Sequence, residues 1–92
     1  MSHIHKTKAK LLNRARRLRG QVEAIERAVE EEKDCAEVLH LVAAVRGAIG
    51  GLMVEVLEDH IRYHVVDPEH EPDARKAEGA ADLIDVVRTY LK

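Results

Sequence analysis

Apolar residues recur at alternating intervals of four and three along more than half of this chain. One series consists of Leu11, Ala15, Leu18, Val22, Ile25 and Val29, and a second consists of Val38, Val42, Val45, Ile49, Leu52 and Val56. This spacing places each series along one face of an α-helix, and it predicts helices over about residues 7–30 and 35–66. Asp34 has the character of an N-cap for the second of them.

The C-terminal third predicts one more helix. Pro68 ends the second helix, because a proline disfavours helical backbone in the residue before it, and Pro72 follows in the same stretch. Beyond them, an apolar side predicts a helix over about residues 74–91; its members are Leu83, Ile84, Val87, Tyr90 and Leu91. No segment alternates in the manner of a strand, so the sequence predicts an all-α fold with a three-helix protomer.

The predicted helices are long for so short a chain. About 30 helical residues extend roughly 45 Å, whereas a compact protein of this length has a radius of gyration of about 12 Å. With no Trp, no Phe and two Tyr, one copy has little with which to cover its apolar stripes. Gly47, Gly50 and Gly51 each cost about 1 kcal/mol against alanine inside a helix, which indicates close approach of another helix there. We therefore expect a homo-oligomer, most simply a dimer forming a helical bundle.

Several classes of protein are disfavoured. Cys35 is the one cysteine, which rules out an internal disulfide framework and fits a reducing cytoplasm. No apolar segment follows the basic N-terminus as in a signal peptide, and no run approaches the roughly 18 apolar residues of a membrane span. No nucleophile–base pair or cofactor loop is visible. The chain is thus expected to be one cytoplasmic domain over residues 1–92, with no membrane partner and no enzymatic activity.

Charge is divided unevenly along the chain. Residues 1–20 contain seven basic residues and no acidic one, while all 17 acidic residues follow, against eight basic ones. A charge run is usually a solvated helix face, but such faces commonly mix signs, whereas a stripe of one sign suits phosphates. Lys10, Arg14 and Arg17 are expected to share one exposed face. The candidate contacts for nucleic acid in this segment are Lys8, Lys10, Arg14, Arg16, Arg17 and Arg19.

His60 and His64 stand four residues apart near the end of the second helix. This spacing lets two imidazoles bind one metal, although capping is the commoner role of such a pair. Cys35 begins the same helix, roughly 37 Å away, so it can join the histidines only if two chains pack antiparallel. His3 and the α-amine of an N-terminal arm (residues 1–6) could fold over such a site. His5 stays an unassigned arm residue, and His40 and His70 receive the ordinary capping interpretation.

Three segments, "RARRLRGQVEAIER", "CAEVLHLVAAVRGAIGGLMVEVLEDHI" and "LIDVVRTYLK", together resemble the CsoR/RcnR (FrmR-type) family of metal- and stress-sensing repressors. The resemblance covers nearly the whole chain. It implies a three-helix protomer, an antiparallel dimer and a dimer of dimers. It also implies that basic residues of the first and second helices bind operator DNA, which adds Arg46 to the candidates, and that an effector lowers the affinity for DNA.

The effector is inferred from the positions that match the family's ligands. Copper(I) sensors resemble this chain at Cys35 and His60 but have a cysteine at the position of His64, and persulfide sensors have a second cysteine at the position of His60. The set of His3, Cys35, His60 and His64 resembles the nickel and cobalt sensors of the RcnR type. Those sensors also use the N-terminal amine, which here belongs to Ser2 once Met1 is removed.

The resemblance therefore implies a repressor that releases DNA on binding Ni(II) or Co(II), with Zn(II) as a further possibility, and so derepresses a metal efflux gene. One alternative is a formaldehyde-responsive repressor acting through Cys35 and the N-terminal amine, although formaldehyde sensors typically begin with Pro after Met and lack a histidine at position 64. A second alternative, from another class, is a small metal-storage protein or enzyme subunit that does not bind DNA.

Overall fold

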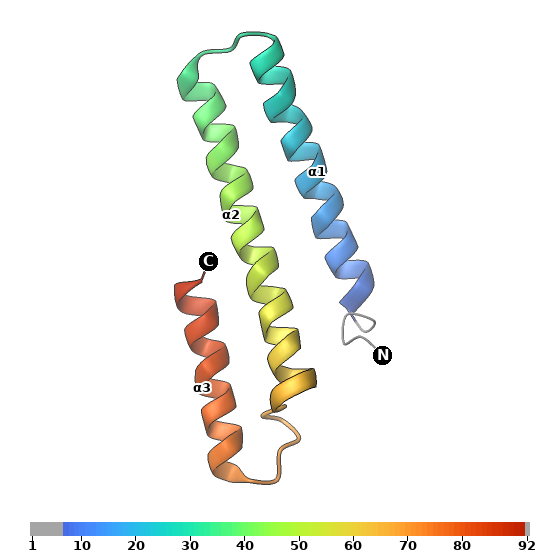
Figure 1. Ribbon diagram of the computed structural model, residues 1–92, viewed down its shortest axis with the longest axis vertical. Coiled ribbons are helices and arrows are strands. Elements are labelled where there is room, and N and C mark those ends of the chain that lie inside the picture. Colours follow the sequence, from blue (N-terminus) through green and yellow to red (C-terminus); the bar gives the residue numbers. More distant parts are fainter. Residues whose placement is uncertain (1–6, 92) are drawn as a thin grey trace.

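The computed structural model describes residues 7–91, which form helices and connecting turns without a strand in that range (Figure 1). Helix α1 spans Lys8–Glu30, α2 spans Cys35–His60 and α3 spans Ala74–Tyr90. A π-helix, η2 (Ile61–Val65), continues α2 directly. Helices α1 and α2 form an antiparallel hairpin, and α3 folds back along the other side of α2 (Figure 1). The expectation of an all-α, three-helix protomer is confirmed.

The protomer is a thin plate. Its principal extents are 57 × 27 × 12 Å and its radius of gyration is 17.3 Å, against about 12 Å for a compact chain of this length. The smallest extent corresponds to a single layer of helices, since one helix with side chains is about 10–12 Å across. The two broad faces of α2 are therefore left uncovered, as the helix lengths predict.

A tight turn closes the α1–α2 hairpin. The N–H of Lys33 donates to the carbonyl of Ala28 at 3.0 Å, and the N–H of Glu32 donates to that of Val29 at 3.1 Å. This pair of bonds is a Schellman motif, and it holds Glu32 in the left-handed region at φ 56°. Asp34 then caps α2, as expected, because its Oδ1 accepts from the N–H of Glu37 at 2.9 Å.

Replacing Glu32 with glycine is expected to stabilise the fold by roughly 0.5–1 kcal/mol. Removing Cβ relieves about 1–2 kcal/mol of left-handed strain, and the greater freedom of glycine in the unfolded chain returns part of it. Thermal unfolding at fixed protein concentration measures the gain. Glu31→Gly is the matched control: Glu31 lies at φ −83°, so glycine there should only destabilise. Equal effects of the two substitutions would contradict the assignment of strain to Glu32.

The best-buried core lies between the second half of α2 and α3. Val54 and Ile61 pack with Ile84 and Val87, and Leu57 covers the cluster. The expected apolar side of α3 is thus divided: Ile84 and Val87 are buried, whereas Leu83, Tyr90 and Leu91 are exposed. On the other side of α2, the glycines were expected to allow the close approach of another helix, and what approaches one of them is a side chain of α1. Arg14 Nη1 lies 2.9 Å from where a Cβ on Gly51 would stand, while nothing lies within 4 Å of such an atom on Gly47.

Large apolar side chains are exposed on all three helices. On α2 they form one face, at positions spaced by three, seven and four residues, consisting of Leu39, Val42, Ile49 and Met53. The continuous helix Cys35–Val65 is also long and apolar enough to cross a membrane, with a mean hydropathy of 1.5 over an 18-residue window. This corrects the expectation that no run approaches such a length. The core helix of a soluble protein passes the same test of length and composition.

Candidate metal centre and DNA interface

The two histidines of the predicted pair lie together at the C-terminal end of α2. His60 is the last residue of α2, His64 belongs to η2, and their ring centroids are 5.1 Å apart with the rings tilted by 32°. Both residues are exposed. The helix widens here, since the N–H of Val66 donates to the carbonyl of Ile61 at 2.8 Å, a π-type bond. Single π-turns occur frequently at functional sites, and this one was not predicted from the sequence.

Cys35 is the first residue of α2 and is exposed. It lines a shallow, mostly apolar hollow with Val29, Lys33, Val38 and Leu39. The full length of α2 separates it from His60, so one chain does not bring the thiol and the imidazoles together (Figure 1). His3, His5 and the Ser2 amine lie outside the described residues.

The chemistry of this donor set suits a borderline divalent metal. One thiolate with two imidazoles is typical of Zn(II), Co(II) and Ni(II) sites, whereas Cu(I) prefers more sulfur. The fit is conditional on geometry, because the sulfur and the imidazoles must come from different copies of the chain. A bound metal would supply the attraction that draws these donors together, at the cost of displacing the protons of the thiol and imidazolium groups.

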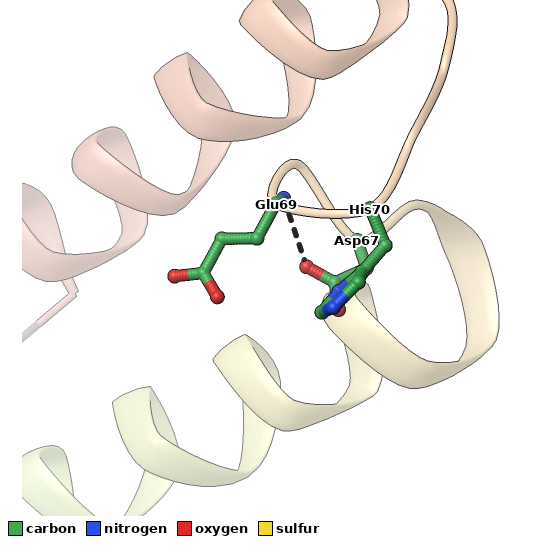
Figure 2. Close-up of side chains that lie close together, drawn as sticks. All are labelled: Asp67, Glu69 and His70. Atoms are coloured by element: carbon green, nitrogen blue, oxygen red, sulfur yellow. Dashed lines mark hydrogen bonds and ion pairs between the residues drawn. The ribbon is translucent and has the colours of Figure 1, made fainter.

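A different group of possible ligands does meet within the chain. Asp67, Glu69 and His70 place carboxylate and imidazole atoms within 4.8 Å of one another in the loop after η2 (Figure 2). Asp67 Oδ2 pairs with His70 Nδ1 at 2.8 Å, and Asp67 Oδ1 accepts from the N–H of Glu69 at 3.0 Å. The contact with His70 is the main cause of the lowered pKa of Asp67.

Arg62 already neutralises this loop cluster. Its Nη1 lies 3.6 Å from Asp67 Oδ1 and 3.8 Å from Glu69 Oε1. A metal cation there would compete with the guanidinium of Arg62. The contacts within the cluster hold the α2–α3 loop together, and this role is sufficient to explain them. His70 therefore pairs with a carboxylate rather than capping a helix. The sequence signal for this contact was the Asp-Pro turn, with a histidine three residues after the Asp.

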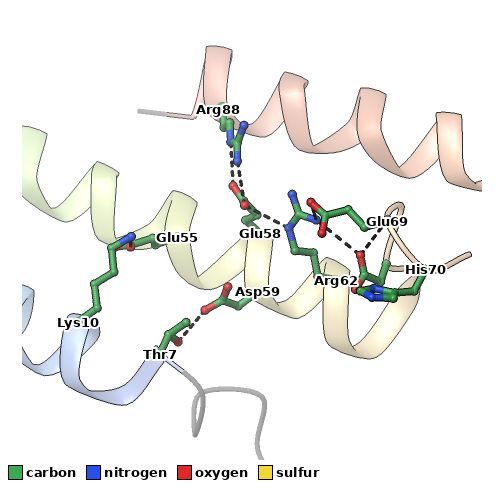
Figure 3. A network of polar contacts seen from close by, with 10 residues as sticks. Thr7, Lys10, Glu55, Glu58, Asp59, Arg62, Glu69, His70 and Arg88 are labelled. Carbon is green, nitrogen blue, oxygen red and sulfur yellow. Dashed lines mark hydrogen bonds and ion pairs between the residues drawn. The ribbon is translucent and has the colours of Figure 1, made fainter.

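An ion-pair network joins α3 to the C-terminal part of α2 and to η2. Arg88 donates from Nε and Nη2 to the two oxygens of Glu58, at 2.8 and 2.9 Å (Figure 3). Arg62 Nε adds a third bond to Glu58 at 3.2 Å. These bonds, that from Arg88 above all, hold the pKa of Glu58 below its ordinary value despite its partial burial.

Acid is expected to weaken this network. A lowered pKa in the folded state means that Glu58 contributes stability above its unfolded pKa, and that the contribution is lost as pH falls below about 4. Glu58→Gln should therefore lower the thermal midpoint at neutral pH, and the difference from the wild type should shrink in acid. Glu78→Gln, on α3 with no ion pair within residues 7–91, is the control. A constant difference at all pH values would contradict this role of Glu58.

The candidate DNA contacts differ in whether they form an ion pair. Lys8, Arg16, Arg17, Arg19 and Arg46 are exposed. Arg46 lies on α2 in a hollow whose lining includes Leu39, Val42 and Ile49. Lys10 and Arg14 form ion pairs with Glu55 of α2, while 67% of the Lys10 side chain remains exposed. Arg14 is less exposed than expected, since 39% of its side chain is exposed and it lies against Gly51.

Thr7 shows how the start of α1 is attached to α2. As the N-cap residue it makes no side-chain capping bond. Its hydroxyl instead donates to Asp59 Oδ2 at 2.8 Å, next to His60 (Figure 3). The contacts of Glu55 and Asp59 were not predicted from the sequence, because both depend on the register of the two helices.

Comparisons with known proteins identify the family of this chain. Residues 7–89 match the family described as metal-sensitive transcriptional repressor. The chain is 47% identical over its full length, and that of the relative, to a Serratia marcescens protein named "Uncharacterized protein in bioA 5'region". It is 41% identical, again over the full length of both, to the "Transcriptional repressor RcnR homolog" of Escherichia coli O139:H28. The sequence-based expectations of a regulatory rather than enzymatic role and of a CsoR/RcnR-type chain are confirmed. This chain belongs to the metal-sensitive transcriptional repressors.

Proposed function

We propose that this chain is a cytoplasmic repressor that releases operator DNA on binding Ni(II) or Co(II), and so derepresses a metal efflux gene. The His60–His64 pair carries the proposal, since its rings lie 5.1 Å apart at an exposed helix end. Two imidazoles with the Cys35 thiolate form a nitrogen-rich set that suits these ions and also Zn(II). The arm would add His3 and the Ser2 amine, and a higher coordination number would favour nickel or cobalt over tetrahedral zinc.

The metal centre requires a second chain. Cys35 and His60 occupy opposite ends of α2, so an antiparallel dimer would bring the Cys35 end of one copy to the His60 end of the other. The apolar face Leu39, Val42, Ile49 and Met53 supports such an assembly, because a plate one helix thick leaves it uncovered. We propose a dimer of this kind, and a dimer of dimers as the complete repressor.

Double-stranded operator DNA is the proposed partner of α1. Lys8, Arg16, Arg17 and Arg19 are exposed on a segment that lacks acidic residues, and symmetry would repeat the stripe in every copy. Arg46 of α2 is included among the proposed DNA contacts because the family resemblance implies that basic residues of the second helix bind DNA. Lys10 and Arg14 become available to phosphates only when their pairs with Glu55 open.

The bond from Thr7 to Asp59 suggests how metal and DNA compete. Thr7 directly follows the arm, and Asp59 directly precedes His60. Ordering the arm and His60 around a metal ion would pull on both partners of this bond and shift the basic start of α1. The coupling must be reciprocal, so DNA must weaken metal binding by the same factor.

Duplex binding with and without Ni(II), at one fixed salt concentration, tests the proposal. We expect the affinity for an operator-containing duplex to fall when Ni(II) is present, and the affinity for Ni(II) to fall when the duplex is present. Equal duplex affinities in both conditions would exclude regulation by this metal.

Formaldehyde sensing through Cys35 and the N-terminal amine is the second candidate function. The exposure of the Cys35 thiol in a shallow hollow favours it, since a small electrophile could reach the sulfur. His64 has no role in that chemistry, so its removal separates the two candidates.

A further inference from the structure

Glu55 lies between α1 and α2 and faces two of the candidate DNA contacts. Its Oε1 is 2.7 Å from Lys10 Nζ, and its Oε2 is 2.5 Å from Arg14 Nε. Figure 3 shows Lys10 reaching from α1 across to this carboxylate. The Glu55 side chain is only 20% exposed, and apart from its ion pair with Arg14 its buried Oε2 has no hydrogen-bond partner within residues 7–91. Its charge is therefore balanced by these two cations rather than by other hydrogen bonds.

Arg14 is held in place at two points along α2. Its Nε pairs with Glu55, and its Nη1 lies close to the backbone of Gly51, one turn earlier, where a Cβ would stand 2.9 Å away. Arg17, three residues further along α1, is exposed and has no ion pair within residues 7–91. Two arginines of the same basic segment thus differ in availability, and Glu55 accounts for the difference.

A DNA phosphate and the Glu55 carboxylate require the same donors. Both are oxyanions that accept charge-assisted hydrogen bonds from guanidinium and ammonium groups. We propose that Glu55 is an internal competitor of DNA phosphate for Lys10 and Arg14, an inference that rests on the proposed DNA-binding function. A duplex that recruits these two cations must leave a partly buried carboxylate without its partners, which is unfavourable. Glu55 therefore lowers the affinity for every duplex and favours those whose remaining contacts are strong enough to open the pairs.

Glu55→Gln tests the competition. We expect Glu55→Gln to bind a mixed-sequence DNA duplex at low salt more tightly than the wild type does. Its gain in affinity should exceed the gain of a control variant by roughly fivefold. The control is Glu23→Gln, which makes the same change in net charge at an exposed position of α1 with no ion pair within residues 7–91. The excess should shrink as salt rises, because salt screens the pairs that are being removed. An affinity of Glu55→Gln equal to or below that of Glu23→Gln overturns the proposal.

A second background identifies the cations involved. In the Lys10→Gln/Arg14→Gln protein, Glu55→Gln should raise the affinity no more than Glu23→Gln does, and a larger gain there overturns the proposal. Circular dichroism checks that each variant is folded. If Glu55→Gln does not fold, Glu55→Asp replaces it, because aspartate keeps the charge on a shorter side chain. A duplex affinity above that of the wild type then supports the competition, and an unchanged or lower affinity overturns it. A wild type that binds no duplex at low salt contradicts DNA binding itself rather than the role of Glu55.

Discussion

Replacing His64 with alanine is expected to weaken Ni(II) or Co(II) binding by at least about 100-fold. Loss of an outer-shell partner of a metal ligand costs about 10- to 100-fold, and loss of a ligand itself should cost at least as much. The proposed site depends on His64 because its ring lies 5.1 Å from that of His60, and α2 offers the metal only one imidazole of this pair without it. Titration of the metal, followed by duplex binding at fixed salt, measures both the affinity and the loss of metal-induced release.

The Co(II) spectrum adds a direct measure of which atoms are bound. A thiolate charge-transfer band should persist in His64→Ala, because Cys35 is intact, and disappear in Cys35→Ser. His40→Ala is the matched control, an exposed histidine in the interior of α2 that should bind metal as the wild type does. Retention of the full Ni(II) response by His64→Ala would exclude the site proposed here, and formaldehyde-induced release that persists in this variant would favour the aldehyde sensor.

Replacing Ile49 with glutamate is expected to separate the copies of the chain and to abolish tight DNA binding. Ile49 is 52% exposed on the face that it shares with Leu39, Val42 and Met53. Burying an unpaired carboxylate in such an interface costs several kcal/mol. A monomer also loses the basic stripe of its partner and the Cys35 that completes the metal centre. The expected result is a smaller mass in sedimentation, at least about tenfold weaker duplex binding, and loss of high-affinity Ni(II) binding.

Ala81→Glu is the control for this substitution. Ala81 is exposed on α3 near Glu78, Asp82 and Asp85, so a new carboxylate there remains solvated. It should leave the mass and the metal affinity unchanged. An Ile49→Glu protein with the wild-type mass would show that a different face joins the copies.

The candidate site was only partly predictable. Cys35, His60 and His64 can be recognised in the sequence as possible metal ligands. The His60–His64 pair needs only one helix to bring it together. The loop cluster of Asp67, Glu69 and His70 was missed because its geometry depends on how the chain turns after the π-helix. The ion pair of Arg14 was missed because the helical periodicity of α1 contains no information about Glu55, which is 41 residues further along the chain.

The sequence by itself determined the three helices, the turn between α1 and α2, and the family to which the chain belongs. These follow from local rules: apolar spacing selects helix, Asp34 caps α2, and proline ends it. Only the tertiary structure decided which basic residues are available. The register of α1 against α2 places Glu55 opposite Lys10 and Arg14, and it places Asp59 opposite Thr7. An ion pair between helices depends on a few ångströms of axial position, and the repeating apolar pattern of two long helices permits several registers that differ by one turn.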